Sequence, residues 1–232
     1  MLHRFHLPAP LTIGERVSLR DEELHHAARV VRVRERESVE LFDGNGNAAR
    51  GVVEELGREA IVIRIEEAVP SREMQADIHL AMAIINLDKF ELVLQKATEL
   101  GVRSLIPLET ERCEVRVERY RGKHERWEKI IFEAVKQSGR SRIPKLEMPQ
   151  PFAEVIAREG SRLFFDADHP PAGETGNPVT LFIGPEGGWS DGEIGLARAH
   201  GASFRQLGIR RLRAETAAIV ATGIVAAHQG EI

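Results

Sequence analysis

The sequence predicts an α/β protein in two parts, a small β-barrel followed by a parallel sheet with helices on both faces. Up to about residue 70, apolar residues alternate with polar ones in short segments divided by turn residues, which is typical of barrel strands. From residue 74 onward, apolar runs alternate with segments of helical period, which predicts parallel strands joined by helices. Pro and Ser at 69–73 suit neither element, so we expect domains at 1–70 and 74–232.

The first part contains four expected strands, one short helix and one strong turn signal. The turn is Asp-Gly-Asn-Gly-Asn at 43–47, where Asn and Gly tolerate the positive φ that a tight hairpin requires. The helix covers residues 21–31, and we expect Asp21 to cap it. The strands are expected at 16–19, 38–42, 49–56 and 60–69.

In the second part, helix signals are clear enough to predict several ends. Ser190 and Glu193 have the spacing of a capping box, and Gly101 and Gly201 are typical C-terminal stops. Helices are expected at 88–101, 124–139, 151–160, 190–201 and 214–230. Strands are expected at 76–85, 102–108, 162–168, 179–184 and 203–208.

Composition excludes several classes of protein. The chain has 232 residues, a formal net charge of −4 and 42% hydrophobic residues, which fits a soluble protein with a sizeable core. Cys113 is the one cysteine, so neither an internal disulfide nor a Cys-based metal site is expected, and a reducing cytoplasm fits. No apolar run approaches the ~18 residues that span a membrane. No residue spacing indicates a metal site.

Two unusual loops follow expected strands, at 184–188 and 208–213. The first has three glycines but no Lys, so it is not a P-loop, and its glycine spacing is not that of a dinucleotide fingerprint. A tight turn without a ligand is the alternative interpretation of this first loop. The second has three arginines before a helix, and a solvated charged turn is its simplest interpretation. Because ligands bind at the carboxyl ends of parallel strands, we expect the two loops to form one site at neighbouring strand ends.

The stretches LFIGPEGGWSDGE at 181–193 and LGIRRLRAETA at 207–217 closely resemble the paired motifs of the RsmE family of the SPOUT superfamily. Segments 89–102 and 126–144 are also similar to that family. The resemblance implies a SPOUT-type parallel sheet with a C-terminal deep trefoil knot, behind a PUA-like β-barrel. It also implies a homodimer that methylates N3 of a uridine in 16S ribosomal RNA. Two residues depart from the family pattern, Arg211 in place of an aliphatic residue and Lys136 in place of an acidic one.

The cofactor that the resemblance implies is S-adenosylmethionine, held near the subunit interface. This molecule has no phosphate, so the absence of Lys from the glycine loop is expected. Apolar residues of the two loops would face its adenine, while backbone N–H groups or an Arg would suit its carboxylate. The expected cofactor residues are Ile183, Gly184, Gly187, Gly188, Leu207, Gly208, Ile209, Arg210, Leu212 and Thr216.

Methylation of uridine N3 requires loss of a proton, so a guanidinium that stabilises the anion and a carboxylate that takes the proton are the expected groups. Arg213 and Arg210 are the catalytic candidates for the first role, and Glu186 for the second. Arg112 and Arg140 are further candidates for the anion. For Glu215, an acid that complements the helix dipole is the simpler interpretation. For Glu186, shaping the loop is as plausible as catalysis.

The RNA partner, 16S ribosomal RNA or the small ribosomal subunit, must be reconciled with the negative net charge. Residues 112–145 hold eleven Lys or Arg against five Asp or Glu, which suits phosphate contact, although a solvated helix face is the ordinary explanation. The RNA-binding candidates are Arg4, Arg29, Arg32, Arg112, Arg140 and Arg142. A non-catalytic RNA-binding assembly factor is the alternative function, and a metabolite-binding α/β protein is a weaker one.

Overall fold

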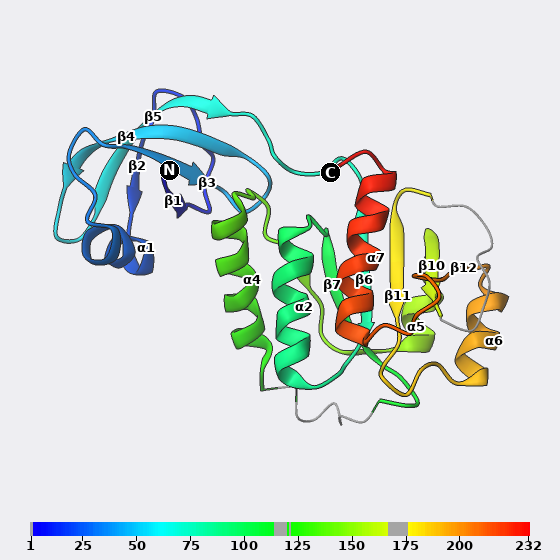
Figure 1. Ribbon diagram of the computed structural model, residues 1–232. Coiled ribbons are helices and arrows are strands. Elements are labelled where there is room, and N and C mark those ends of the chain that lie inside the picture. The colour runs from blue at the N-terminus through cyan, green and yellow to red at the C-terminus, as the bar shows by residue number, and fades with distance from the viewer. Residues whose placement is uncertain (1, 114–119, 121, 167–175) are drawn as a thin grey trace. The chain divides into compact units, whose positions relative to one another are not determined.

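The computed structural model describes residues 2–113, 120, 122–166 and 176–232 (Figure 1). The chain divides into two compact units, which we call the N-terminal unit and the C-terminal unit. The N-terminal unit comprises Met1–Glu73 and Val135–Ile143, and the C-terminal unit comprises Met74–Ala134 and Pro144–Ile232. Sequence patterns do not predict that the short segment Val135–Ile143 groups with the N-terminal unit.

The N-terminal unit is built on a curled five-stranded sheet in the order β1-β3-β4-β5-β2. β1 is parallel to β3, and the other pairs are antiparallel. The register of β4 against β5 shifts twice, at Arg50/Gly51 and at Val53/Glu55, and such bulges increase the bend of a strand. The strands are β1 His3–His6, β2 Arg16–Leu19, β3 Ser38–Phe42, β4 Ala48–Leu56 and β5 Ile61–Val69. Four of them were expected, and β1 was not.

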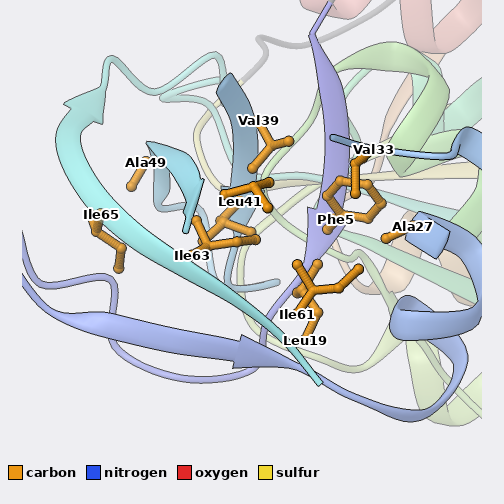
Figure 2. Close-up of a cluster of buried hydrophobic side chains, with 11 residues drawn as sticks. Phe5, Leu19, Ala27, Val33, Val39, Leu41, Ala49, Ile61, Ile63 and Ile65 are labelled. Carbon is orange, nitrogen blue, oxygen red and sulfur yellow. The ribbon is translucent and has the colours of Figure 1, made fainter. Parts of the chain in front are cut away.

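The core of this unit lies inside the curl of the sheet (Figure 2). Apolar side chains from alternate strand positions meet there, including Phe5, Leu41 and Ile63, which are fully buried. Gly51 is required by this packing, because a Cβ at that position would lie 2.6 Å from Cγ2 of Ile63. Ala27, from the helical segment, closes one end of the cluster.

The helical segment consists of α1 Asp21–His25 and η1 His26–Val31, a wider helical turn. The expectation that Asp21 caps it is wrong. The N-cap is Arg20, no side chain makes a capping hydrogen bond, and Asp21 itself has a φ of 49°. The hairpin signal at 43–47, in contrast, is confirmed, since the Asp43 carboxylate accepts hydrogen bonds from the N–H groups of Asn45 and Asn47.

The C-terminal unit contains a parallel sheet in the order β12-β10-β11-β6-β7-β8, with β9 also paired to β7. The five strands expected from the sequence are present, and the two-residue strands β8 and β9 were not expected. The end of the segment expected at 162–168 lies outside the described residues. The strands are β6 Ile78–Ala83, β7 Ser104–Glu109, β8 Lys145–Leu146, β9 Gln150–Pro151, β10 Ser161–Phe165, β11 Val179–Ile183 and β12 Ser203–Arg205.

Helices cover both faces of this sheet, as the alternation of elements predicts (Figure 1). α2 and α7 pack against each other, and α7 lies on β6 and β11. α5 and α6 belong to a second core cluster with the aromatic side chains Phe164, Phe182 and Phe204. The helices are α2 Leu87–Glu99, α4 His124–Ser138, α5 Phe152–Ile156, α6 Asp191–Ala199 and α7 Ala214–His228.

The helix ends predicted from the capping box and from two glycines are confirmed, whereas the helix expected at 151–160 ends at Ile156. Ser190 and Glu193 form a complete capping box at the start of α6, and Gly101 and Gly201 have φ values of 90° and 69° just beyond α2 and α6. Within the described residues, no helix has both the length and the apolar character needed to cross a membrane. The trefoil knot stays a prediction of the family resemblance.

Candidate active site

The two loops singled out in the sequence lie in the C-terminal unit and face one cavity of about 540 Å³. Its volume falls within the range of about 300–1,000 Å³ that is usual for ligand sites. One wall is formed by the end of β11 and the glycine loop 184–188, and another by residues 207–208 and 210–213. The first turn of α7 supplies Ala214 and Ala217, and Arg112 enters from the segment after β7.

The expectation that the loops follow neighbouring strands needs one correction. β10 lies between β11 and β12 in the sheet, so the strands that precede the two loops are not adjacent. The end of β10 therefore contributes to the cavity as well, through Phe165 and Asp166. The site spans three strand ends, which gives it a broader floor than two adjacent strands could provide.

Most of the expected cofactor residues lie together in this cavity. The eight that line it are Ile183, Gly184, Gly187, Gly188, Leu207, Gly208, Arg210 and Leu212. The other two do not line it. Ile209 is 99% exposed, and Thr216 is an exposed residue of α7.

The three glycines of the first loop serve different contacts. A Cβ on Gly184 would lie 2.9 Å from the indole of Trp189, and a Cβ on Gly187 would lie 3.1 Å from Cβ of Arg112. Gly188 has a φ of 70°, a conformation that side chains other than glycine rarely adopt. Trp189 is buried and donates a hydrogen bond to the carbonyl oxygen of Phe165 at 3.0 Å, which ties this loop to the end of β10.

Arg112 is held against the glycine loop by a chain of polar contacts. The Glu193 carboxylate, which completes the capping box of α6, also accepts a hydrogen bond from the N–H of Glu111 at 2.9 Å. The next residue, Arg112, then packs on Gly187 and donates a long hydrogen bond, 3.4 Å, to its carbonyl oxygen. The helix cap at α6 thus positions a guanidinium at the cavity wall.

Positive charge dominates the described wall of this cavity. Arg210 and Arg213 line it, and neither has an ion-pair partner within the described parts of the chain. Arg213 is the N-cap of α7, so the positive end of the helix dipole points to the same place. These groups can stabilise an anion that forms in the cavity.

The two carboxylate candidates lie near Lys89 of α2. Glu186 lines the cavity and its Oε1 lies 3.2 Å from Lys89 Nζ, while Oε2 of Glu215 lies 4.0 Å from the same nitrogen. Glu215 is buried in the first turn of α7 and does not line the cavity. The ion pair of Glu186 favours the loop-shaping role, and the position of Glu215 fits the dipole-complementing role.

Two of the expected RNA-binding residues, the buried Arg140 and the half-buried Arg4, are paired within the N-terminal unit. Arg140 is 5% exposed and its guanidinium forms an ion pair with Glu73 at 2.8 Å, while the same carboxylate accepts the N–H groups of Ser141 and Arg142. Arg4 forms an ion pair with Glu40 at 2.7 Å and donates to three carbonyl oxygens between residues 135 and 140. Both arginines bind the segment Val135–Ile143 into its unit, which corrects the picture of Arg140 as a group beside the reacting base.

The other candidates on this unit are more accessible. Arg29 and Arg32 are exposed residues in or beside η1, and Arg142 is half-buried beside the hairpin loop, with Nη2 close to Gly46. Oppositely charged partners for these three arginines are absent from the described residues.

Sequence reasoning missed several residues of the site. Phe165 and Asp166 were part of an expected strand whose carboxyl end was not considered, and Trp189 was seen only as part of a motif. Asp191, Ile194 and Arg205 also line the cavity. The rule that ligands bind at carboxyl ends of parallel strands would have found Phe165, Asp166 and Arg205. In the parts that the structure describes, no group of His, Cys, Asp and Glu is arranged to hold a metal ion.

Comparison with known proteins agrees with this geometry. The family model described as "RNA methyltransferase domain" matches residues 72–226, and one described as "RNA methyltransferase PUA domain" matches residues 19–66. Ribosomal RNA small subunit methyltransferase E of Synechocystis is 30% identical over 95% of this chain and 76% of its own length. The protein of the same name from Rickettsia conorii is 26% identical over 94% and 93%.

Solved structures give the same result. The crystal structure of ribosomal RNA small subunit methyltransferase E from Neisseria gonorrhoeae, bound to S-adenosylmethionine, is 30% identical with a TM-score of 0.89. A putative methyltransferase from Legionella pneumophila, also in complex with that cofactor, is 35% identical with a TM-score of 0.83. Each alignment covers 98% of both chains.

The fold and the matched domains define this chain as an RNA methyltransferase with an N-terminal PUA domain. More specifically, the chain belongs to the ribosomal RNA small subunit methyltransferase E family.

The cavity fits a cofactor that has an apolar ring system and no phosphate. Ile183, Leu207 and Leu212 provide apolar wall, and the glycine loop brings backbone close to the space without a Lys. A Cβ on Gly184 or Gly187 would push into Trp189 or Arg112, so neighbouring groups already fill the room that those glycines leave. Gly188 is different, because the nearest atom to a Cβ there belongs to the end of the flexible Arg211 side chain.

Proposed function

We propose that this chain transfers a methyl group from S-adenosylmethionine to N3 of a uridine in small-subunit ribosomal RNA. The observation that carries the proposal is the single cavity that the glycine loop and the arginine loop share at three strand ends. Its fit to a phosphate-free cofactor agrees with the cofactor named in the two solved relatives.

The residues of the chain would act on the uridine. Bound S-adenosylmethionine supplies an activated methyl group and leaves as a neutral thioether. Uridine N3 must lose its proton, and negative charge then spreads onto the two carbonyl oxygens of the base. Arg210 and Arg213, with the N-terminus of α7, would stabilise that charge. Glu186, one of the carboxylates that line the cavity, is the candidate to accept the proton, although its ion pair with Lys89 favours bracing of the loop.

A methylation assay tests this proposal. Small ribosomal subunits that lack the modification are incubated with the protein and S-adenosylmethionine, and the RNA is digested and read by mass spectrometry. We expect N3-methyluridine with the wild type and none with Gly188→Val, because a branched side chain is strained at a φ of 70°. Gly195→Ala is the matched control, since nothing lies within 4 Å of a Cβ at that helical position. RNA binding without any methyl transfer would favour the assembly-factor alternative.

RNA would also contact the N-terminal unit. Arg29, Arg32 and Arg142 are the more accessible of the RNA-binding candidates there, and a PUA domain of the RNA methyltransferase type supports this role. We propose the cytoplasm as the compartment, because ribosomal subunits are the substrate and the chain has a single cysteine.

A homodimer is part of the proposal. Val220 and Ile224, one helical turn apart on α7, are 36% and 41% exposed, and Leu92 on the neighbouring α2 is 41% exposed. Such an apolar stripe on two packed helices is suited to the same stripe of a second copy. Light scattering should give twice the mass of the chain for the wild type and one chain mass for Ile224→Lys. A wild-type protein that is monomeric at micromolar concentration would refute the dimer without affecting the methylation assay.

A further inference from the structure

Two arginines lie beside neighbouring residues of the glycine loop, Arg112 at Gly187 and Arg211 at Gly188. Arg112 packs on Gly187 and donates to its carbonyl oxygen, as described above. On the next residue, a Cβ placed on Gly188 would lie 3.6 Å from Nη2 of Arg211. Both arginines are exposed residues that line the cavity. In the described part of the chain, neither has a carboxylate partner.

The cavity wall carries more positive charge than the single carboxylate of the cofactor can neutralise. Five arginines and three carboxylic acids line it, namely Arg112, Arg205, Arg210, Arg211, Arg213, Asp166, Glu186 and Asp191. One of those acids, Glu186, is already paired with Lys89. S-adenosylmethionine has one carboxylate but also an ammonium and a sulfonium group, so it is a cation overall and an excess of guanidinium groups repels it. The excess therefore matches a second, anionic ligand.

We propose that Arg112 and Arg211 form a phosphate-binding pair that holds one phosphodiester of the substrate RNA at Gly187–Gly188. Guanidinium groups bind phosphate oxygens through paired N–H donors, and two of them can hold one phosphate from both sides. Among the described residues, the end of the Arg211 side chain is the one group within 4 Å of a Cβ position on Gly188, so the loop is open to a phosphate at this residue. Arg112 is positioned by the hydrogen bond from the N–H of the preceding residue to Glu193. Arg211 reaches Gly188 only with the end of its long side chain.

This inference rests on the proposed function, because it assumes that RNA enters the cavity. It adds a positioning role, in which the pair sets where the RNA backbone lies and hence where the target base lies. The pair is distinct from Arg213, which would act on the base itself. The alternative ligand of the same chemistry is the carboxylate of the cofactor, and the experiment separates the two.

The test uses Arg211→Met, which keeps the length and apolar part of the side chain but removes the charge. RNA affinity is measured by filter binding over a range of salt, cofactor affinity by calorimetry, and methyl transfer by the assay above. We expect RNA to bind about tenfold more weakly, as for loss of a charged hydrogen bond. The salt slope of log K should fall by about 0.7 for a single strand. Cofactor affinity should stay within twofold, and KM for RNA should rise more than kcat falls.

Arg103→Met is the matched control, since Arg103 precedes β7 at the amino ends of the parallel strands and pairs with Asp77. It should leave RNA affinity unchanged. Arg112→Met combined with Arg211→Met should weaken RNA binding by less than the product of the single effects, because both groups hold one phosphate.

Weaker cofactor binding with unchanged RNA binding would overturn the inference in favour of the cofactor carboxylate. Unchanged affinity for both ligands would overturn it outright. RNA binding is read separately from methyl transfer, so a wild-type protein that binds RNA but does not methylate would refute the proposed function and still leave the pair tested.

Discussion

Two arginines of the N-terminal unit, Arg4 and Arg140, differ from three arginines of the cavity in what they contact. Arg140 is buried and the side chain of Arg4 is 10% exposed, and both guanidinium groups bind carboxylates or carbonyl oxygens of their own unit. Arg112, Arg211 and Arg213 are exposed at the cavity wall and have no carboxylate partner among the described residues. The same residue type therefore serves the fold in one place and is left available to a ligand in the other.

The largest effect is expected where a buried pair is broken. Arg140→Ala leaves the Glu73 carboxylate without its charged partner, and such changes cost about 3–5 kcal/mol of unfolding free energy. Urea denaturation would measure this loss. The matched control, Arg103→Ala, breaks a half-exposed pair and should cost less than about 1 kcal/mol. If Arg140→Ala kept full stability but bound RNA more weakly, the division between the two groups of arginines would be wrong.

The opposite behaviour is expected for a cavity arginine. Arg213→Ala should reduce turnover by about 10²-fold, the scale for loss of one anion-stabilising donor, and leave stability almost unchanged. Higher pH should restore part of the rate, because solvent then supplies more deprotonated uridine. Steady-state kinetics between pH 7 and pH 9, with cofactor affinity from calorimetry, would measure both. A parallel loss of cofactor affinity, with no recovery at high pH, would assign Arg213 to bracing of the loop.

Glycines can also be divided into those that the packing requires and those that it does not. Gly184 serves the fold, because a Cβ there would meet the buried indole of Trp189 at 2.9 Å. Gly184→Ala should therefore cost about 1–3 kcal/mol, as overpacking does. Gly195→Ala in α6 meets nothing within 4 Å and should stabilise the protein by about 0.5–1 kcal/mol. Thermal unfolding of both variants would test the contrast, and equal shifts would show that Trp189 can move at no cost.

The sequence predicted secondary structure better than it predicted which side chains contact each other. The strong periodic patterns and the Ser190–Glu193 spacing are local signals, so the sheet, most helices and the capping box could be predicted. Arg140 could not be distinguished from Arg112, because burial and the Glu73 pair depend on contacts between residues far apart in the chain. The short strands β8 and β9 carry too few residues to show a period.

The candidate site was predictable to the extent that glycines and strand ends mark it. The two loops carry residue types that regular elements avoid, so most of the cavity wall could be predicted. The contribution of Asp166 and Arg205 depends on β10 lying between β11 and β12, and strand order is a property of the whole sheet. The position of Arg211 over Gly188 likewise depends on how two loops meet.

The smallest expected effect concerns a titratable group that the fold uses, His79. Burial lowers the pKa of His79 below its ordinary value of about 6.5, and its Nδ1 lies 2.7 Å from Oγ of Ser104. The unfolded chain therefore binds a proton at this residue before the folded chain does. Its contribution to stability is complete above about pH 6.5 and is lost as the pH falls from there through the lowered pKa of the folded state.

His79→Gln keeps a hydrogen-bonding group and removes the titration. The unfolding free energy of the wild type should decline relative to the variant between pH 7.5 and pH 5.5, by at most about 1.4 kcal/mol for each pH unit. Urea denaturation at both values would measure the difference, and the other histidines cancel because both proteins contain them. Parallel pH curves for the two proteins would mean that the half-buried ring accepts its proton as readily as an exposed one. His79 would then make no contribution to the pH dependence of the unfolding free energy.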